Sequence, residues 1–298
     1  MDPAVLFEGV SKTFSGFLGR NRVEAVRELS LEVPRGEIFG LLGPNGSGKT
    51  TSIFMMLGLL RPTSGRVSVF GLVPGTGLLG TTRRGGLDLK RRIGFLPEEF
   101  LPPDLLTGEE ILRYYGGFHG IAPRELERRI DHYLDLLSMQ AARARKFREY
   151  SKGMQRRIGL AQVLLHEPEL LILDEPTNGL DPIGVQELKG LLLELKAAGR
   201  TIIICSHVLP EIETICDRIA ILHQGACVCS GLTRELLGER DRYQLVLEAV
   251  DSEGAEKAAR LLRDHDFNVS SVGRTQQTLE RLFMDRVGRA KADPKTDR

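Results

Sequence analysis

The stretch from Gly43 to Thr50, "GPNGSGKT", constrains the fold of this chain more than any other part of the sequence. It matches the spacing G-x-x-x-x-G-K-[ST], in which backbone N–H groups wrap phosphate oxygens and the lysine reaches the β and γ phosphates. The apolar run "EIFGLL" precedes it and "TSIFMMLGLL" follows, so a strand, a glycine-rich turn and a helix are predicted in that order. This order is typical of the first β–α unit of an α/β fold that binds a nucleotide. The predicted nucleotide contacts form one continuous run: Gly43, Pro44, Asn45, Gly46, Ser47, Gly48, Lys49, Thr50 and Thr51.

A second apolar run, "LLILDEP", places two carboxylates at the end of a predicted buried strand. Ligands of α/β sheets bind at the carboxyl ends of the strands, so we expect Asp174 near the phosphates. There, Asp174 and the Thr50 hydroxyl are the predicted Mg²⁺ ligands, Lys49 acts on the transferred phosphate, and Glu175 polarises the attacking water. An isolated Asp-Glu pair more often only solvates a strand end. The phosphate-binding turn upstream favours the catalytic interpretation here.

A second anion-binding pattern, "EYSKGMQRR" (residues 149–157), stands far from the first. Ser151 and Gly153 precede the helix-forming run "IGLAQVLL". A helix N-terminus presents free N–H groups and the positive end of the helix dipole to an anion. By itself, this pattern more often marks an ordinary helix cap. The first pattern already accounts for one bound nucleotide, so the purpose of a second phosphate-binding pattern in the same chain needs an explanation.

Hydrophobic periodicity predicts the rest of the architecture. Apolar strands that alternate with helices indicate a buried parallel sheet, and alternating runs near the N-terminus indicate a partly exposed antiparallel sheet. The predicted strands are 4–10, 27–33, 65–71, 170–173 and 201–205, with a hairpin at 218–231 that turns at Gln224-Gly225. Helices are predicted through most of 107–165 and at 183–198, and 72–90 is interpreted as a surface loop.

The pattern changes after about residue 237, which predicts two domains. The first is 1–237, with a helical subdomain at about 100–165, and the second is 238–298. We expect the second to be a small α+β appendage with strands at 243–250 and 267–274, helices at 255–266 and 278–289, and a disordered tail.

Charge and composition argue against some classes of function. Lys plus Arg number 41 against 40 Asp plus Glu, a formal charge of +1, whereas nucleic-acid binding needs a concentrated basic surface. No N-terminal signal is expected, and the longest apolar run, Ile53 to Leu60, falls short of the roughly 20 residues that span a bilayer. Cys227 and Cys229 share one face of a predicted strand, where a metal site is conceivable. Small, mostly buried thiols of a cytosolic protein are the favoured interpretation of all four cysteines.

Taken in order, these motifs resemble those of the nucleotide-binding subunit of an ABC transporter, over about residues 4–235. "YSKGM" (150–154) resembles the family's signature, commonly L-S-G-G-Q. Ser151 and Gly153 match its phosphate-contacting positions, whereas Lys152 replaces a glycine and Met154 the glutamine. These departures are similar to those of the exporter branch, which moves drugs, polymers or ions outward.

Four further residues take a role only from this resemblance. "NGLDP" (178–182) resembles the D-loop, with Asp181 facing a dimer partner, and "ICSH" places His207 where the family has its switch histidine. Phe14 stands where an aromatic residue stacks on adenine, although packing against a strand is equally compatible with the sequence. Glu98, in the Q-loop-like "IGFLPEE" (93–99), replaces a glutamine that senses the γ-phosphate. A carboxylate can coordinate Mg²⁺ but cannot donate as an amide does; the alternative is that Glu98 only solvates a loop.

The resemblance implies an α/β P-loop ATPase of ABC type, with a mixed sheet core, an antiparallel β subdomain and a helical subdomain. It implies ATP and Mg²⁺ as cofactors, a separate transmembrane permease, and a second nucleotide-binding subunit, expected here in a homodimer. Two such subunits pack head to tail, so that each ATP lies between one chain's phosphate turn and the partner's signature. The expected location is cytoplasmic, peripheral on the inner face of the cell membrane, with no nucleic acid partner. The alternatives are a non-transport ABC ATPase that acts on nucleic acid, ribosomes or protein assemblies, and a P-loop kinase, in which the signature and the histidine would be idle.

Overall fold

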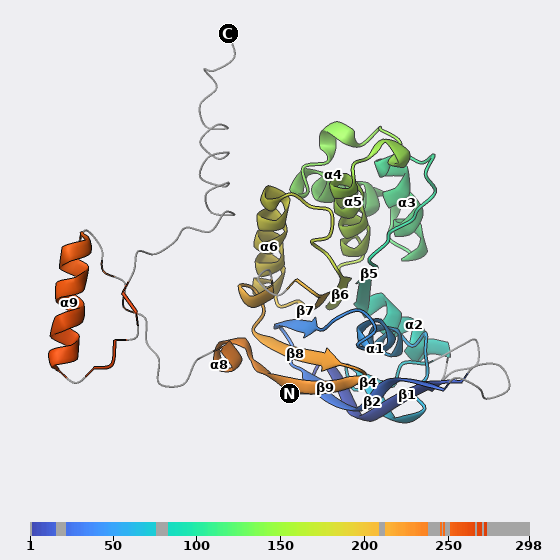
Figure 1. Ribbon diagram of the computed structural model, residues 1–298. Helices are drawn as coiled ribbons and strands as arrows, with labels where there is room; N and C mark the ends of the chain where they lie inside the picture. The colour runs from blue at the N-terminus through green and yellow to red at the C-terminus, as the bar shows by residue number, and fades with distance from the viewer. Residues whose placement is uncertain are drawn as a thin grey trace, which may run out of the picture. The chain divides into compact units, whose positions relative to one another are not determined.

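The computed structural model of the protein describes residues 2–15, 22–75, 83–208, 212–237, 245, 247, 251–265, 267–269, 271 and 272. The chain divides into two compact units, 1–237 and 238–298. The larger unit contains two sheets with helices packed around them (Figure 1). The α/β class predicted from the sequence is therefore confirmed.

A six-stranded sheet runs through the larger unit in the order β5-β6-β7-β3-β8-β9. Its strands are β3 (Ile38–Leu42), β5 (Ile93–Leu96), β6 (Leu170–Asp174), β7 (Thr201–Ser206), β8 (Arg218–His223) and β9 (Ala226–Leu232). Neighbouring strands from β5 to β8 are parallel, and β9 is antiparallel to β8, so the sheet is mixed. Every residue of β3, β6 and β7 is buried. This burial on both faces is why these strands are continuous apolar runs in the sequence.

The register of three strands brings three segments of the chain to one edge of this sheet. Leu42 pairs with Ser206, and Asp174 pairs with Cys205. These pairs lie at the carboxyl ends of parallel strands, so the turn after β3, the acids at the end of β6 and the histidine after β7 share an edge. Ligands of α/β sheets bind at this edge.

A three-stranded antiparallel sheet has the order β2-β1-β4. Its strands are β1 (Val5–Phe14), β2 (Val23–Val33) and β4 (Ser64–Val69). Along the end of β2, Leu29, Leu31 and Val33 are buried, whereas Ser30 and Glu32 are exposed. The alternation that predicted a partly exposed strand is therefore confirmed.

Helices cover the central sheet, and three of them, α3 to α5, stand together as a helical subdomain (Figure 1). The described part of this unit includes the helices α1 (Lys49–Met56), α2 (Arg83–Arg92), α3 (Gly108–Phe118), α4 (Pro123–Leu136), α5 (Lys152–Leu164), α6 (Pro182–Ala197) and α8 (Thr233–Leu237), with 3₁₀ turns η2 (Gln140–Ala142) and η3 (Phe147–Glu149). The central sheet separates two hydrophobic clusters. Leu171 and Leu173 belong to the cluster that includes α3 to α5, and Leu170 and Ile172 to the cluster that includes the antiparallel sheet.

One predicted loop contains a helix. The sequence predicts a surface loop at 72–90, but α2 begins at Arg83, and this part of the prediction is wrong. Leu89 of α2 is buried in the same cluster as the antiparallel sheet. The last turn carries three basic residues, which interact favourably with the helix dipole. Gly85-Gly86, a pair of poor helix formers, concealed this helix in the sequence.

The hairpin between β8 and β9 turns as predicted. Gln224 and Gly225 both have positive φ, 48° and 83°, which is the conformation of a tight two-residue hairpin turn. The four cysteines are free thiols: Cys205 and Cys216 are buried, and Cys227 and Cys229 are half-buried.

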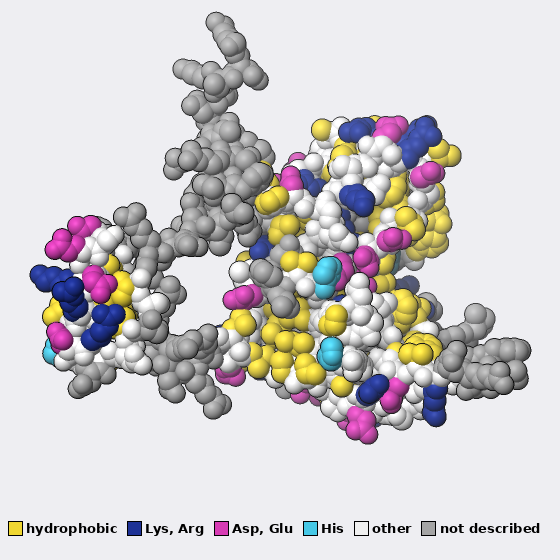
Figure 2. All heavy atoms as spheres, in the orientation of Figure 1, with side chains coloured by type: hydrophobic (Ala, Val, Ile, Leu, Met, Phe, Trp, Pro, Cys, Tyr) yellow, Lys and Arg dark blue, Asp and Glu magenta, His cyan; other side chains and the backbone are white. Residues whose placement is uncertain are grey.

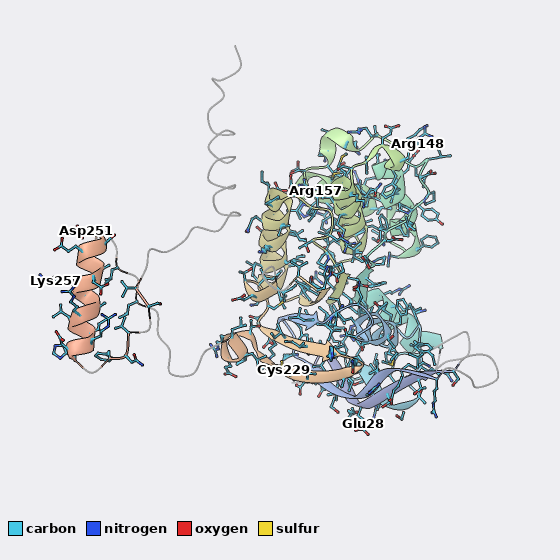
Figure 3. The ribbon with its side chains drawn as sticks, viewed as in Figure 1. Glu28, Arg148, Arg157, Cys229, Asp251 and Lys257 are labelled. Carbon is cyan, nitrogen blue, oxygen red and sulfur yellow. The ribbon has the colours of Figure 1, made fainter. Side chains whose placement is uncertain are left out.

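In the smaller unit, the structure describes α9 (Ser252–Asp264), which confirms the helix predicted at 255–266. Asp251 caps its start by accepting a hydrogen bond from the Gly254 N–H at 2.7 Å (Figure 3). The described residues of the predicted strands 243–250 and 267–274 form no strand, and the helix predicted at 278–289 lies outside the described residues. Among all residues that the structure describes, no helix has both the length and the apolar composition needed to cross a membrane.

Candidate active site

The turn between β3 and α1, here called the phosphate turn (residues 43–50), needs glycine at two positions. Gly43 and Gly48 have φ of 151° and 105°. A Cβ at Gly43 would lie 2.3 Å from the Leu222 carbonyl oxygen, and one at Gly48 would lie 2.6 Å from that of Ala25. Backbone conformation and lack of space therefore both require glycine. Of the other predicted contacts, Pro44, Asn45, Gly46 and Thr50 are exposed, and Thr51 is half-buried.

Lys49, the first residue of α1, is only 7% exposed despite its charge. Its Nζ donates to the carbonyl oxygens of Gly43 at 2.5 Å and Pro44 at 3.3 Å, so the ammonium group closes over the turn. The Oγ atoms of Ser47 and Ser52 are buried and have no hydrogen-bond partner within the described part of the chain. Buried hydroxyls are normally paired, so the Ser47 hydroxyl fits a turn that takes up a polar ligand, and Ser52 lies in α1 directly after that turn.

Two buried carboxylates follow one another at the end of β6. Asp174 is the last residue of the strand, and Glu175 comes next with φ of +48°, which is uncommon for a residue other than glycine. The Glu175 N–H donates to the Cys205 carbonyl at 2.8 Å and so keeps this strained residue against β7. Backbone strain of this kind concentrates at functional sites.

The Glu175 carboxylate is held from the end of β7. The Ser206 hydroxyl donates to Oε2 at 3.2 Å, and His207 Nδ1 lies 2.8 Å from Oε1. The His207 side chain is 54% exposed, so it connects a buried acid with the surface. Sequence reasoning singled out Glu175 and His207 but missed Ser206; its position directly before His207 was the available signal.

Asp174 carries an unfavourable charge in this structure. Burial raises the pKa of Asp174 to about 6; the carboxylates of Glu175 and Glu98 add to this effect, and Lys49 and Arg156 oppose it. A bound cation would relieve the repulsion, and carboxylate and hydroxyl oxygens are ligands that Mg²⁺ accepts. No group of three or more His, Cys, Asp or Glu among the described residues could hold a metal ion. Mg²⁺ at phosphate sites needs only one or two protein ligands, so Asp174 and Thr50 fit that role when a nucleotide is present.

Glu98 lies in the loop that follows β5 and is exposed. Its carboxylate is near enough to affect the pKa of Asp174, and its backbone carbonyl accepts a hydrogen bond from Arg156 at 3.1 Å. Glu98 therefore belongs to the surroundings of the acid pair, and its role on Mg²⁺ stays a prediction.

The signature (residues 150–154) is separate from the phosphate turn of the same chain. Ser151 is the N-cap of α5, and its hydroxyl accepts a hydrogen bond from the Met154 N–H at 3.3 Å. α5 lies in the helical subdomain, away from α1 (Figure 1). A Cβ at Gly153 would lie 3.6 Å from the Leu180 side chain, so the signature contacts the D-loop (residues 178–182). Asp181 caps α6 by accepting from the Gly184 N–H at 2.7 Å.

Phe14 is the last residue of β1 and is 43% exposed. The Lys12 ammonium lies 5.2 Å from its ring centroid. Phe14 is thus both a strand residue and an accessible aromatic ring, and adenine stacking stays a prediction.

Comparison with known proteins agrees with this geometry. The family described as "ABC transporter" matches residues 26–178. An uncharacterized ABC transporter ATP-binding protein of Synechocystis sp. is 41% identical over 261 residues, which cover 86% of this chain and 71% of that protein. The bacitracin transport ATP-binding protein BcrA of Bacillus licheniformis is 38% identical over 255 residues, covering 84% of this chain and 78% of that protein. A solved dimeric structure of an ATP-binding cassette in a post-hydrolysis state, bound to ADP and Pi, has a TM-score of 0.69 at 25% identity and covers 77% of this chain and 99% of that one.

Proposed function

This chain belongs to the ABC transporter family as an ATP-binding subunit that hydrolyses ATP, and we propose that it powers an exporter built with separate membrane chains. One observation carries the proposal. The phosphate turn with Lys49, the acids Asp174 and Glu175, and His207 meet at one edge of the central sheet.

Each residue has a role that follows from its position. Backbone N–H groups of the phosphate turn and the Lys49 ammonium bind the β and γ phosphates of ATP. Thr50 and Asp174 would hold Mg²⁺, which would offset the phosphate charges. Glu175, oriented by Ser206 and His207, accepts a proton from the water whose oxygen bonds to the γ phosphorus. The bond between that phosphorus and the β–γ bridging oxygen then breaks, and ADP and phosphate are released.

A second copy of the chain completes each ATP site in this proposal. The signature and the phosphate turn lie apart within one chain, so one ATP needs the turn of one copy and Ser151 and Gly153 of the other (Figure 1). The relative bound to ADP and Pi is itself dimeric, which supports this arrangement.

An exposed apolar patch supports a membrane partner. Leu101, Leu105, Tyr114 and Phe118 are 79%, 59%, 50% and 70% exposed, and we call them the docking patch. The Tyr114 and Phe118 rings contact each other edge to face, with centroids 5.0 Å apart. Figure 2 shows hydrophobic side chains gathered at the edge of the larger unit where Figure 1 places α3. Exposed apolar patches mark interaction sites. Leu101 follows closely after Glu98 in the same loop, so a short segment connects the patch with the surroundings of Asp174.

Outward transport and a peripheral position on the inner face of the cell membrane complete the proposal. The signature departs from L-S-G-G-Q at Lys152 and Met154, as in the exporter branch, and one relative is named for bacitracin transport. A subunit of this kind reaches the membrane through its partner.

Membrane association of the tagged protein tests the proposal. We expect wild type to sediment with membranes, to resist a salt wash and to be released by detergent together with an integral membrane protein. Leu101→Ser combined with Phe118→Ser should shift most of the protein to the supernatant and leave ATP binding within about threefold, because the patch lies outside the phosphate turn. Leu59→Ser with Val228→Ser, at positions 63% and 60% exposed, is the matched control and should stay with the membranes. Sedimentation of wild type with ribosomes or nucleic acid instead would contradict a transport role.

A further inference from the structure

Arg156 is a buried cation that none of the assigned roles uses. It lies on α5, five residues after Ser151, and is only 7% exposed. At the α-helical rise this puts its backbone roughly 7 Å along the axis from the signature. Its side chain reaches the loop after β5 and the segment after β6.

Within the described part of the chain, the guanidinium of Arg156 donates to backbone carbonyls, and these come from two segments of the active site. Nη1 donates to Pro97 at 2.6 Å and to Glu98 at 3.1 Å, in the loop after β5. Nη2 donates to the carbonyl of Asp174, and Nε to that of Pro176 at 3.2 Å, on either side of Glu175. One side chain of the signature helix therefore holds the backbone around all three site carboxylates.

The buried guanidinium keeps its charge. Burial lowers the pKa of Arg156 to about 10, and the nearby carboxylates of Asp174, Glu98 and Glu175 oppose that shift, so the group is cationic at neutral pH. A planar guanidinium presents its donors in a fixed fork, and a buried cation that loses its acceptors is strongly unfavourable. Displacement of α5 must therefore carry these carbonyls with it or break a costly set of contacts.

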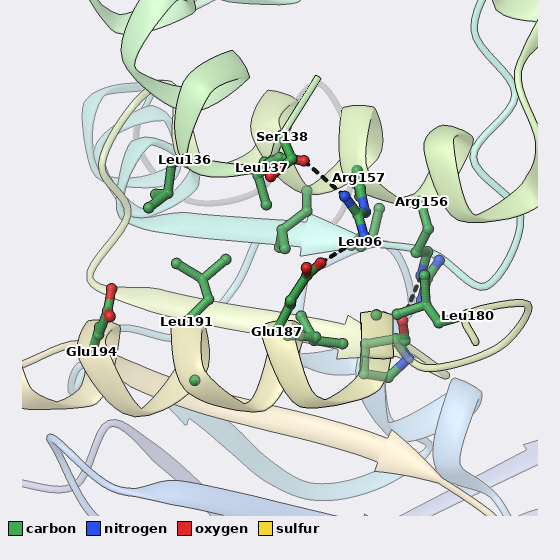
Figure 4. Close-up of a pocket in the computed structure, with 15 residues that line it drawn as sticks. Leu96, Leu136, Leu137, Ser138, Arg156, Arg157, Leu180, Glu187, Leu191 and Glu194 are labelled. Atoms are coloured by element: carbon green, nitrogen blue, oxygen red, sulfur yellow. Dashed lines mark hydrogen bonds and ion pairs between the residues drawn. The ribbon is translucent and has the colours of Figure 1, made fainter. Parts of the chain in front are cut away.

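The packing between α5 and α6 beside Arg156 is incomplete. A cavity of about 260 Å³ lies between α5 and α6, and Leu96, Leu160, Leu180 and Leu191 line it together with Arg156 and Arg157 (Figure 4). Arg157, the next residue, has different partners: it donates to the Leu137 carbonyl at 3.2 Å and pairs with Glu187 at 2.6 Å (Figure 4). The two adjacent arginines therefore join α5 to different parts of the molecule.

We propose that Arg156 is a positioning residue for hydrolysis, which ties the backbone at Glu98, Asp174 and Pro176 to the helix that begins at the signature. The inference rests on the proposed function, in which the partner's ATP binds that signature. When the dimer closes on the phosphate, Arg156 then fixes the positions of the site carboxylates in the chain that supplies the signature.

Purified full-length variants test this role, with ATP-dependent dimerisation, KM, kcat and the Mg²⁺ requirement measured on each. In Arg156→Met the backbone carbonyls lose their donor, and kcat should fall about 10²-fold, the scale of a misplacement near 1 Å. Arg156→Lys keeps the charge without the fork and should recover part of this loss, to about tenfold below wild type. KM, Mg²⁺-free nucleotide binding and dimerisation should stay within about threefold, whereas the Mg²⁺ concentration for half-maximal rate should rise several-fold.

Arg157→Met and Arg157→Lys are the matched controls, because Arg157 also donates to a backbone carbonyl from α5 but reaches no site residue. They should keep kcat and the Mg²⁺ requirement within about threefold. The inference is overturned if the Arg156 variants keep the wild-type kcat. It is also overturned if KM rises, dimerisation fails and kcat falls together, as replacement of a merely structural residue would cause. If Arg156→Met does not fold, Arg156→Lys carries the test alone. Absence of ATP hydrolysis in wild type would instead refute the proposed function.

Discussion

At the scale of single residues, the candidate active site contains one strained acid. Glu175 has a positive φ, is buried, and has its carboxylate held by Ser206 and His207. Such a conformation costs on the order of 1–3 kcal/mol and persists only where the surroundings impose it. The strain and the two contacts orient the carboxylate, and orientation is what a general base for water needs.

Replacement of this acid should separate ATP binding from hydrolysis. Glu175→Gln keeps the shape and the Ser206 contact but cannot accept a proton, so kcat should fall about 10²–10⁴-fold while ATP binding persists. Size-exclusion chromatography with Mg²⁺ and ATP should then show a stable dimer. Near-normal turnover would assign the base elsewhere, with His207 the first candidate.

Asp174 should show a trade-off between stability and function. Its pKa is about 6 in the folded protein, against an ordinary value of 3.8 that we take for the unfolded chain. Above pH 6 the group is charged in both states, and the charge is less favourable in the folded one. This charge destabilises the nucleotide-free protein at neutral pH by at most roughly 3 kcal/mol, and the penalty is lost as pH falls through 6 towards 4. Asp174→Asn should therefore raise the free energy of unfolding at pH 7.5, raise it less at pH 5, and abolish Mg²⁺-dependent hydrolysis. Urea unfolding at both pH values without nucleotide or Mg²⁺ checks this, and a loss of stability at pH 7.5 would contradict it.

At the scale of elements, a pair of stacked histidines joins the helical subdomain to the central sheet. His119 follows α3 and His166 follows α5, with ring centroids 3.9 Å apart and planes 3° from parallel. His166 Nε2 lies 3.1 Å from the Ile93 carbonyl on β5. Burial, His119 and Arg129 lower the pKa of His166 to about 4. The hydrogen bond to Ile93 opposes this shift but does not cancel it, so His166 is uncharged at neutral pH.

This stack should make the protein sensitive to mild acid. Between pH 6.5 and 4, His166 is protonated in the unfolded chain but not in the folded protein. The free energy of unfolding therefore decreases as pH falls through this range. At pH 5, His166 lowers the free energy of unfolding by about 2 kcal/mol relative to neutral pH. His166→Gln should lose that much less unfolding free energy between pH 7.5 and 5 than wild type. His132→Gln, at an exposed position on α4, is the control and should follow wild type. Equal losses in all three proteins would contradict the assignment.

Elements were predictable where one physical signal dominated. β6 and β7 are buried on both faces, so they stand out as apolar runs, and Gln224-Gly225 has the composition that a tight hairpin needs. α2 was hidden because its glycine pair resembles a loop and its burial depends on Leu89 packing from a distant part of the chain. Local sequence carries no information about such packing.

The same limit applied to the site. Motif spacing predicted the phosphate turn, the acids and His207, because each occupies a fixed place after a strand. Ser206 and Arg156 were missed because their importance depends on which carboxylates and carbonyls the fold brings to them. The motif predicted that Gly43 and Gly48 must be glycine. It could not predict that the carbonyls of Leu222 and Ala25 leave no room for a side chain there.

At the scale of the whole molecule, one chain carries two anion-binding patterns that begin different helices. Lys49 is on α1, and Ser151 begins α5 in the helical subdomain (Figure 1). In a head-to-tail homodimer, each ATP would contact Lys49 of one copy and Ser151 of the other. This arrangement is a property of the pair of chains.

A mixed dimer of two inactive variants tests this arrangement. Lys49→Ala removes the cation of the phosphate turn, and Ser151→Arg blocks the signature with a bulky side chain. Each variant alone should fail to dimerise with ATP, because both sites of its homodimer carry the lesion. If turn and signature of one chain served the same ATP, both sites of the mixed dimer would be broken as well. If they serve ATP across the interface, one site contains both substitutions, and the other has an intact Lys49 and an intact Ser151.

Mixing the variants with Mg²⁺ and ATP, in a Glu175→Gln background that prevents hydrolysis, should therefore restore dimers. Size exclusion of differently tagged chains gives the readout, and the homodimer of the Glu175→Gln chain is the positive control. A mixed dimer joined by a covalent linker that still binds no ATP would refute the exchange, because one of its sites has every residue the proposal requires.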